Sequence, residues 1–216
     1  MRAPSGSVPD LWIVSAALAA VAACARPAPP ELRIGINPWP GYEVLSLAAD
    51  HGFYRAEGLD ARLVEFHSLA DERRAYERGQ IDVMGTTVIE VLQARDVPSR
   101  APQIIQVVDY SNGADVVLAQ PGYARLAELR GARIGVELAS LGVYVLARAL
   151  AQEGLQLTDV VLVSTDQLSM EAEFRRGELA AIVTYPPTSV KLARDGYGRA
   201  VFSSRELPRE VVDVLA

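Results

Sequence analysis

Cysteine and lysine are nearly absent from this chain of 216 residues, in which Cys24 is the one cysteine and Lys191 the one lysine. A single thiol can form neither an internal disulfide nor a multi-thiolate metal site. The two histidines, His51 and His67, have no further ligand at metal-binding spacing, so we expect neither a metal nor a cofactor. The formal net charge of −6 disfavours nucleic acid as a partner.

The first residues lack the features of a folded domain. Their apolar run, from 11 to 23, is shorter than the roughly 20 residues of a membrane-spanning helix, and a proline-rich stretch follows it. We therefore predict a lipoprotein signal peptide over residues 1–23 and a tether over 24–31. The stretch Val21-Ala22-Ala23-Cys24 resembles a bacterial lipobox and predicts a lipid anchor on Cys24, which would hold the protein at the membrane in the cell envelope. The alternative is a soluble secreted protein with an incidental cysteine.

An internal duplication organises the rest of the chain. Residues 32–36 match 132–136, and each stretch precedes a glycine-containing loop and a helix of small residues. Further on, residues 76–84 correspond to residues 174–182, and both stretches contain an Arg-Gly pair that is typical of a helix end. Each copy reads as strand, helix, strand, helix, strand, which predicts an α/β fold of two lobes, each with a mainly parallel sheet flanked by helices. Chance similarity between two common α/β units is the alternative.

The repeats also predict the division of the chain. We expect lobe 1 over residues 32–110 and lobe 2 over 111–203, with the return crossover and the start of a further lobe 1 segment over 204–216. Stretches 108–113 and 202–205 are expected to be hinges. Parallel strands carry their functional loops at their carboxyl ends, so facing ends would enclose a cleft between the lobes.

An ordered set of short motifs resembles the substrate-binding proteins of the nitrate, sulfonate and taurine type ABC importers, a group that includes binders of thiamine pyrimidines. The motifs are RIG at 33–35, WPGY at 39–42, AADHGFY at 48–54, EGL at 57–59, RGQIDV at 78–83, GAD at 113–115, LRGARIG at 129–135 and RGE at 176–178. The resemblance implies the periplasmic-binding type II fold and an extracytoplasmic receptor that captures a small molecule without transforming it. ABC permease and ATPase subunits would be its partners.

One departure from the family concerns the end of the chain. In the family the chain returns to the first lobe and continues through more helices and strands, whereas this sequence stops after the apolar run 211–216. We therefore expect the first lobe to lack its closing helices and to expose apolar surface.

The ligand-binding candidates lie in loops at corresponding places in the two repeats. Loops 37–42 and 137–142 would place free backbone N–H groups, aromatic walls and hydroxyl groups at helix starts, and hydroxyl groups also follow the third strand of each copy. The candidates are Trp39, Gly41, Tyr42, Thr86, Thr87, Asn112, Glu137, Ser140, Leu141, Gly142, Thr184 and Tyr185. Structural roles are the alternatives: Trp39 packing on the hinge, Ser140 and one threonine of each pair capping helices, and Asn112 in a turn.

The charge of the ligand depends on two glutamates. Glu137 directly follows a strand and would be close to the cleft, whereas Glu90 is expected at the solvated surface. A carboxylate in the cleft would repel nitrate or a sulfonate and attract an amine, a protonated pyrimidine or another cation.

Two other functions remain as alternatives. A related group with this fold makes the thiamine pyrimidine, using a lysine-bound pyridoxal cofactor and a cysteine-rich motif. This chain offers only Lys191, in a helix that we expect to be exposed, so no catalytic residue is assigned. A sensory module that reports its ligand to a membrane kinase or cyclase is the other alternative.

Overall fold

The computed structural model of the protein describes residues 30–96 and 100–216. The predicted signal peptide, the predicted lipidation at Cys24 and most of the predicted tether lie outside the described residues. Residues 31–216 form a unit of their own. Within the described ranges, no helix has both the length and the apolar character that crossing a bilayer requires.

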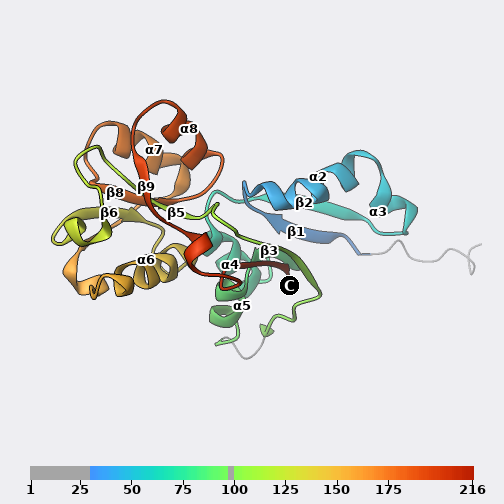
Figure 1. Ribbon diagram of the computed structural model, residues 1–216. Helices are drawn as coiled ribbons and strands as arrows, with labels where there is room; N and C mark the ends of the chain where they lie inside the picture. The colour runs from blue at the N-terminus through green and yellow to red at the C-terminus, as the bar shows by residue number, and fades with distance from the viewer. Residues whose placement is uncertain (1–29, 97–99) are drawn as a thin grey trace, which may run out of the picture. The chain divides into compact units, whose positions relative to one another are not determined.

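The first sheet has five strands in the order β2-β1-β3-β10-β4 (Figure 1). Its strands are β1 (Leu32–Ile36), β2 (Ala61–Glu65), β3 (Val83–Thr87), β4 (Gln106–Tyr110) and β10 (Val212–Leu215). Its helices are η1 (Pro40–Tyr42), α2 (Glu43–Asp50), α3 (Phe53–Ala56), α4 (Leu69–Glu77) and α5 (Val88–Ala94). Strand β1 pairs in parallel with β2 and β3, whereas β10 runs antiparallel to both of its neighbours.

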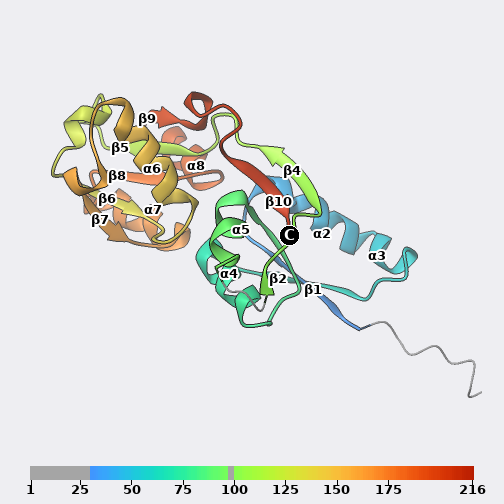
Figure 2. The ribbon, with the colours of Figure 1, turned by 90° about the horizontal axis from the view of Figure 1, so that it is seen from below.

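The second sheet repeats this plan in the order β7-β6-β8-β5-β9 (Figure 2). Its strands are β5 (Val116–Ala119), β6 (Arg133–Val136), β7 (Val161–Ser164), β8 (Ala181–Thr184) and β9 (Arg199–Ser203). Its helices are η3 (Leu126–Leu129), α6 (Leu141–Gln152), η4 (Leu157–Asp159), α7 (Gln167–Arg175) and α8 (Thr188–Arg194). Strand β5 is the antiparallel member. The prediction of two mainly parallel sheets flanked by helices is confirmed.

The duplicated unit has a fifth strand that lies in the sheet of the other lobe. Strands β1 to β4 build the first sheet, but β5, which follows them, inserts between β8 and β9. In the same way β6 to β9 build the second sheet, and β10 inserts between β3 and β4. Each lobe is therefore completed by a strand from the other repeat.

The second sheet is covered on both faces, and the alternation along its strands shows why. Val117 and Ala119 of β5 pack in the larger core with Leu146 and Leu150 of α6. Val116 and Leu118 point the other way, into a second core that includes Phe174 and Leu192 from α7 and α8. Because side chains alternate between faces along a strand, an entirely apolar strand requires helices on both sides.

Local sequence signals set the helix boundaries that frame the cleft. The side chains of Ser68 and Thr87 accept backbone hydrogen bonds at the starts of α4 and α5, and Asp166 does so at the start of α7. Arg78 and Arg176 are the C-cap residues of α4 and α7, and each is followed by a glycine with positive φ, 73° at Gly79 and 74° at Gly177.

The two crossovers between the lobes lie side by side and are hydrogen-bonded to each other. The hydroxyl groups of Ser111, after β4, and Ser204, after β9, are 2.8 Å apart. The Ser204 hydroxyl also accepts from the backbone N–H of Gly113 at 2.7 Å, and the Ser204 N–H donates to the carbonyl of Asp115. The strands that leave and re-enter the first lobe are thus held together at one place.

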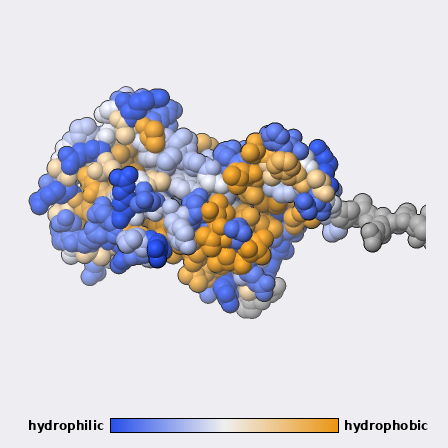
Figure 3. Space-filling model, turned by 45° about the vertical axis from the view of Figure 1, so that its right-hand side comes forward, coloured by the Kyte–Doolittle hydropathy of each residue, from blue (hydrophilic) through white to orange (hydrophobic). Residues whose placement is uncertain are grey.

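The first lobe exposes apolar side chains that its counterpart in the second lobe buries. Helix α6 buries five residues, including Val145 and Leu146, whereas α2 buries none, and its Val44 is 60% exposed. At strand β4 of the same lobe, Ile105, which precedes the strand, and Tyr110, which ends it, are also exposed, at 68% and 54%. Figure 3 shows apolar surface gathered over this lobe.

Candidate functional site

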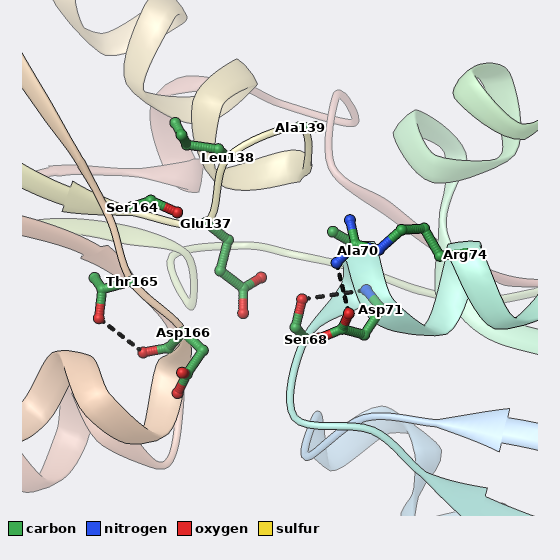
Figure 4. A pocket seen from close by; sticks show the side chains of 10 residues that line it. All are labelled: Ser68, Ala70, Asp71, Arg74, Glu137, Leu138, Ala139, Ser164, Thr165 and Asp166. Atoms are coloured by element: carbon green, nitrogen blue, oxygen red, sulfur yellow. Dashed lines mark hydrogen bonds and ion pairs between the residues drawn. The ribbon is translucent and has the colours of Figure 1, made fainter.

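A hollow with a volume of ≈ 420 Å³ lies between the lobes and is bordered by loops from both. Ser68 and Asp71, at the start of α4, line it from the first lobe, and loops 137–139 and 164–166 line it from the second. In Figure 4 the carboxylate of Glu137 projects into the space between Asp166 and the start of α4. Arg74 also lines the hollow, but its guanidinium donates to Asp71 at 2.5 Å.

Two small inner cavities share four lining residues and have a volume of ≈ 10 Å³ each. The shared residues are Leu69, Asp115, Leu141 and Tyr185, which come from both lobes. Glu137 lines one of these cavities as well as the outer hollow. A cavity of this size matches about one water molecule, whereas ligand pockets usually measure about 300–1,000 Å³. The inner part of the cleft must therefore widen before it can hold an organic molecule.

Glu90 connects the lobes at the start of α6. Its Oε1 accepts hydrogen bonds from the Ser140 hydroxyl at 3.0 Å and from the Leu141 backbone N–H at 2.8 Å, and its Oε2 accepts from the Thr87 hydroxyl. The expectation that Glu90 is a solvated surface residue is wrong, because its exposed fraction is 0%. A first-lobe carboxylate thus occupies the positive end of a second-lobe helix, where an anion would otherwise be favoured.

A second carboxylate lies at the corresponding helix start of the first lobe. The indole N–H of Trp39 donates to Asp109 Oδ2 at 3.1 Å, just before the η1 and α2 helices. A Cβ placed on Gly41 would lie 2.1 Å from the same oxygen, so only glycine permits this approach. The predicted role of Gly41 as an N–H donor to a ligand therefore competes with a carboxylate of the chain itself.

Asp109 and Asp213 face each other across the antiparallel pair β4 and β10. Burial, with the nearby Asp109 carboxylate, raises the pKa of Asp213 to about 9. The hydroxyl of Tyr42 donates to Asp213 Oδ1 at 3.3 Å and to the carbonyl of Thr86 at 2.6 Å. Like charges directly opposite on paired strands repel, so this pair favours retention of a proton or the approach of a positive charge.

Three further carboxyl groups are desolvated in the same region. Burial raises the pKa of Glu72 to about 8, of Glu137 to about 8 and of Asp115 to about 6. The charge of the neighbouring Glu90 carboxylate also raises the pKa of all three groups. The amide of Asn37 donates to Glu72 at 3.3 Å and to the carbonyl of Gly85 at 2.9 Å, which partly compensates for the burial.

Several buried polar atoms around the cleft have no hydrogen-bond partner among the described residues. They are Glu72 Oε1, Thr86 Oγ1, Asp109 Oδ1, Glu137 Oε1, Tyr185 OH and Asp213 Oδ2. Buried polar groups in folded proteins are nearly always paired, so these atoms mark a place where water or a ligand would complete the hydrogen bonding.

The structure brings most of the predicted site residues together. Those that line a cavity are Trp39, Thr87, Glu137, Leu141, Gly142 and Tyr185. The Trp39 and Tyr185 rings, from different lobes, meet edge to face with centroids 5.9 Å apart. Tyr42, Thr86, Ser140 and Thr184 are buried next to the cavities, and Thr184 donates to Gln167 at 2.7 Å.

The proposed capping roles of Thr87 and Ser140 have different outcomes in the structure. Thr87 caps α5, as the helix-capping alternative proposed, whereas the Ser140 side chain makes no capping hydrogen bond and donates to Glu90 instead. Asn112 is exposed and lines none of the three cavities, so it lies outside the site.

The predicted site residues did not include six residues that line the inner cavities. They are Asn37, Leu69, Asp115, Gln167, Val183 and Asp213. For Asp213 a signal was present, because an aspartate inside the apolar run 211–216 is unusual unless it faces a polar site. The described residues contain no group of three histidine, cysteine or acidic side chains placed to hold a metal ion.

Comparison with curated proteins gives distant relatives. Proteins of Brucella abortus and Brucella melitensis, whose names propose a binding role, are 26% identical to this chain over 159 residues. The match covers 72% of this chain and 48% of the relative. The chain thus spans about half the length of the curated relatives it matches.

Solved structures share the fold. The alkanesulfonate-binding protein SsuA of Xanthomonas axonopodis pv. citri, bound to MOPS, is 25% identical with a TM-score of 0.74, over 88% of this chain and 66% of that one. The periplasmic nitrate-binding protein NrtA of Synechocystis PCC 6803 is 13% identical with a TM-score of 0.69, over 86% and 55%. The resemblance to the nitrate and sulfonate group and its periplasmic-binding fold is confirmed.

The family assignment rests on the length of the match. The model of the NMT1-like family matches residues 25–216, which include both repeats and every residue of the site described above. This chain belongs to the NMT1-like family.

Proposed function

We propose that this chain is the solute-binding part of an ABC importer, which captures a small molecule between its two lobes and presents it to a permease. The observation that carries the proposal is the convergence of unpartnered buried polar atoms from both lobes on the interlobe cavities. Glu137 Oε1 and the Tyr185 hydroxyl come from the second lobe, and Asp213 Oδ2 comes from the first sheet. A molecule held by both lobes stabilises their closed arrangement.

The crossovers provide the place where such a closure would turn. Among the residues that the structure describes, the chain passes between the sheets only through 111–115 and 204–211, and the Ser111 and Ser204 hydroxyl groups bond there. Small changes of backbone angle in two adjacent connections rotate one lobe against the other, as in hinge closure. The permease would recognise the closed form.

The named roles of the structural neighbours support the same proposal. SsuA of Xanthomonas is named as an alkanesulfonate-binding protein and NrtA as a periplasmic nitrate-binding protein. We place this protein outside the cytoplasmic membrane by analogy, with Cys24 as the proposed lipid anchor. No chemistry is assigned, because the hydroxyl groups that lie beside a carboxylate, those of Ser140 and Thr87 on Glu90, are buried.

A thermal-shift screen of the protein tests the proposal. The panel contains sulfonates, nitrate, amines, amidines, pyrimidines and vitamin precursors, and a molecule that binds the folded state raises the melting temperature by mass action. Trp39→Ala should abolish the shift for any hit, because Trp39 lines the inner cavity. Tyr197→Ala is the matched control, since the Tyr197 ring packs on Arg175 away from the cleft. A panel in which no compound shifts the wild-type protein would refute the proposed function.

A further inference from the structure

The interlobe cleft is rich in acidic side chains and poor in basic ones. Asp71 and Asp166 line the outer hollow. Six further acidic side chains lie in or beside the cavities, namely Glu72, Glu90, Asp109, Asp115, Glu137 and Asp213. Within the described ranges, none of these six forms an ion pair with an arginine or with Lys191. Arg74 is the sole cationic side chain that lines the three cavities, and it is paired with Asp71.

The positions that would attract an anion are already taken by the chain itself. Glu90 accepts from the Leu141 N–H at the start of α6, and Asp109 lies against Gly41 at the start of the first helical segment. Helix N-termini are the sites where anionic ligands bind in folds of this type. An incoming sulfonate or nitrate would have to displace one of these carboxylates and approach the others, and repulsion opposes both.

Hydrogen-bond acceptors, in contrast, remain free inside the cleft. Glu137 is 6% exposed and Asp213 is 5% exposed, and each has one buried oxygen without a donor among the described residues. Both side chains line cavities, Glu137 the outer hollow and one inner cavity, and Asp213 the other inner cavity. Once deprotonated, two carboxyl groups with a free oxygen each in a desolvated space favour a partner that supplies N–H donors and positive charge.

Aromatic rings border the same space. Trp39 and Tyr185 line the cavity that contains Asp213, and Leu69 and Leu141 add apolar surface. A cation is attracted to the face of an aromatic ring, most strongly when it is desolvated. The walls therefore suit the carbon body of an organic cation better than a hydrated metal ion.

We propose that the cleft takes a small organic cation, an ammonium, amidinium or protonated amino-heterocycle, whose N–H groups donate to Glu137 and Asp213. Its apolar part packs against Trp39 and Tyr185. This inference rests on the solute-binding role proposed above and names the ligand class of the same site. It also distinguishes the chain from its structural neighbours that are named for sulfonate and nitrate.

The sign of the pH dependence separates this ligand class from an anion. The carboxyl groups hold protons at neutral pH, and a cation binds best when those protons have left. The groups that face the two carboxyls are Asp109, Asp115 and Tyr42 around Asp213, and Glu90, Asp166 and Asp71 around Glu137. The one basic group beside them is Arg74, which also lines the outer hollow, and its charge is paired with Asp71 and does not change between pH 6 and 8. Affinity for a cation therefore rises with pH, whereas affinity for an anion falls.

Isothermal titration with matched probes tests the inference. Benzylamine and benzamidine are the cationic probes, benzamide the neutral isostere and benzenesulfonate the anionic one, with methylguanidine and Zn²⁺ as further arms. We expect the cations to bind at least about tenfold more tightly than benzamide, with affinity that increases from pH 6 to pH 8. Tighter binding of benzenesulfonate, benzamide or Zn²⁺ would overturn the inference but leave the solute-binding role intact. If no probe of any class binds, both the inference and the solute-binding role fail.

Isosteric variants test whether Asp213 and Glu137 contact the bound cation. Asp213→Asn and Glu137→Gln should each weaken binding of the best cation about tenfold or more and flatten its pH dependence. Glu178→Gln is the matched control, because Glu178 is exposed and pairs with Arg176 outside the cleft. Circular dichroism of each variant confirms that it is folded. Unchanged cation affinity in both folded cleft variants would contradict the proposed contacts.

Discussion

Removal of the Glu90 carboxylate should destabilise the protein far more than its type and its place in a short helix suggest. Glu90→Ala leaves the Leu141 N–H and the Ser140 hydroxyl without their acceptor in a buried place, and it also frees the Thr87 hydroxyl. Hydrogen bonds to a charged group contribute about 1.5–3 kcal/mol each, and loss of one partner of a buried charged network costs about 3–5 kcal/mol.

Repulsion reduces that figure. The charge of the Glu90 carboxylate raises the pKa of Glu72 and of Glu137, so removal of Glu90 also removes an unfavourable interaction with each of them. We therefore expect the free energy of unfolding of Glu90→Ala to fall by about 2–4 kcal/mol. Glu90→Gln keeps an acceptor oxygen for Ser140 and Leu141 and loses the charge, and we expect a loss of about 1 kcal/mol.

Urea denaturation followed by circular dichroism measures these differences. Glu57→Ala provides the control, because Glu57 is exposed and surface substitutions usually change stability by less than about 0.5 kcal/mol. Small-angle scattering of Glu90→Ala should also report a larger radius of gyration, since the bonds it removes join the two lobes. A Glu90→Ala variant as stable as Glu57→Ala would refute the assignment of Glu90 as the link between the lobes.

Three further predictions concern other parts of the cleft. The free energy of unfolding should fall as pH rises from 5 to 8, because Asp213 and Glu137, with pKa values of about 9 and 8 in the folded state, retain protons that the unfolded chain releases near pH 4; a flat profile of urea midpoints against pH would contradict this. Ser204→Ala removes the partner of Ser111 and should lower the free energy of unfolding by about 1–2 kcal/mol, measured in urea. Tyr185→Phe removes a hydroxyl that has no hydrogen-bond partner in the described part of the chain, so the melting temperature should not fall, whereas the affinity for the ligand found by screening should weaken; unchanged affinity would exclude a contact of that hydroxyl with the ligand.

The repeat was visible in the sequence because it depends on local signals. Alternation of apolar strands with helices, together with the Arg-Gly helix ends, sets the order of elements without reference to distant contacts. Residues after the parallel strands, such as Trp39, Glu137 and Tyr185, could be placed at the cleft because parallel strands share one functional edge. The structure confirms the fold and brings these three side chains to the cavities.

The acidic character of the cleft could not be predicted in the same way. Asp115 precedes β5 and Asp213 lies in β10, the antiparallel strands. An antiparallel strand begins at the edge of the sheet where its parallel neighbours end. Its first residues therefore lie at the functional edge, and a prediction based only on the carboxyl ends of strands does not include them. Glu90 was misplaced for another reason: its partners Ser140 and Leu141 are about 50 residues away, and helical position alone does not reveal them.

The exchange of β5 and β10 has a consequence for how the protein is assembled. A fragment containing the first repeat alone would hold a strand with no sheet to join and a sheet missing the strand between β3 and β4. Two copies of one repeat could satisfy each other by trading their final strands, as in a domain-swapped homodimer. The chain has the architecture that fusing such a pair end to end would produce.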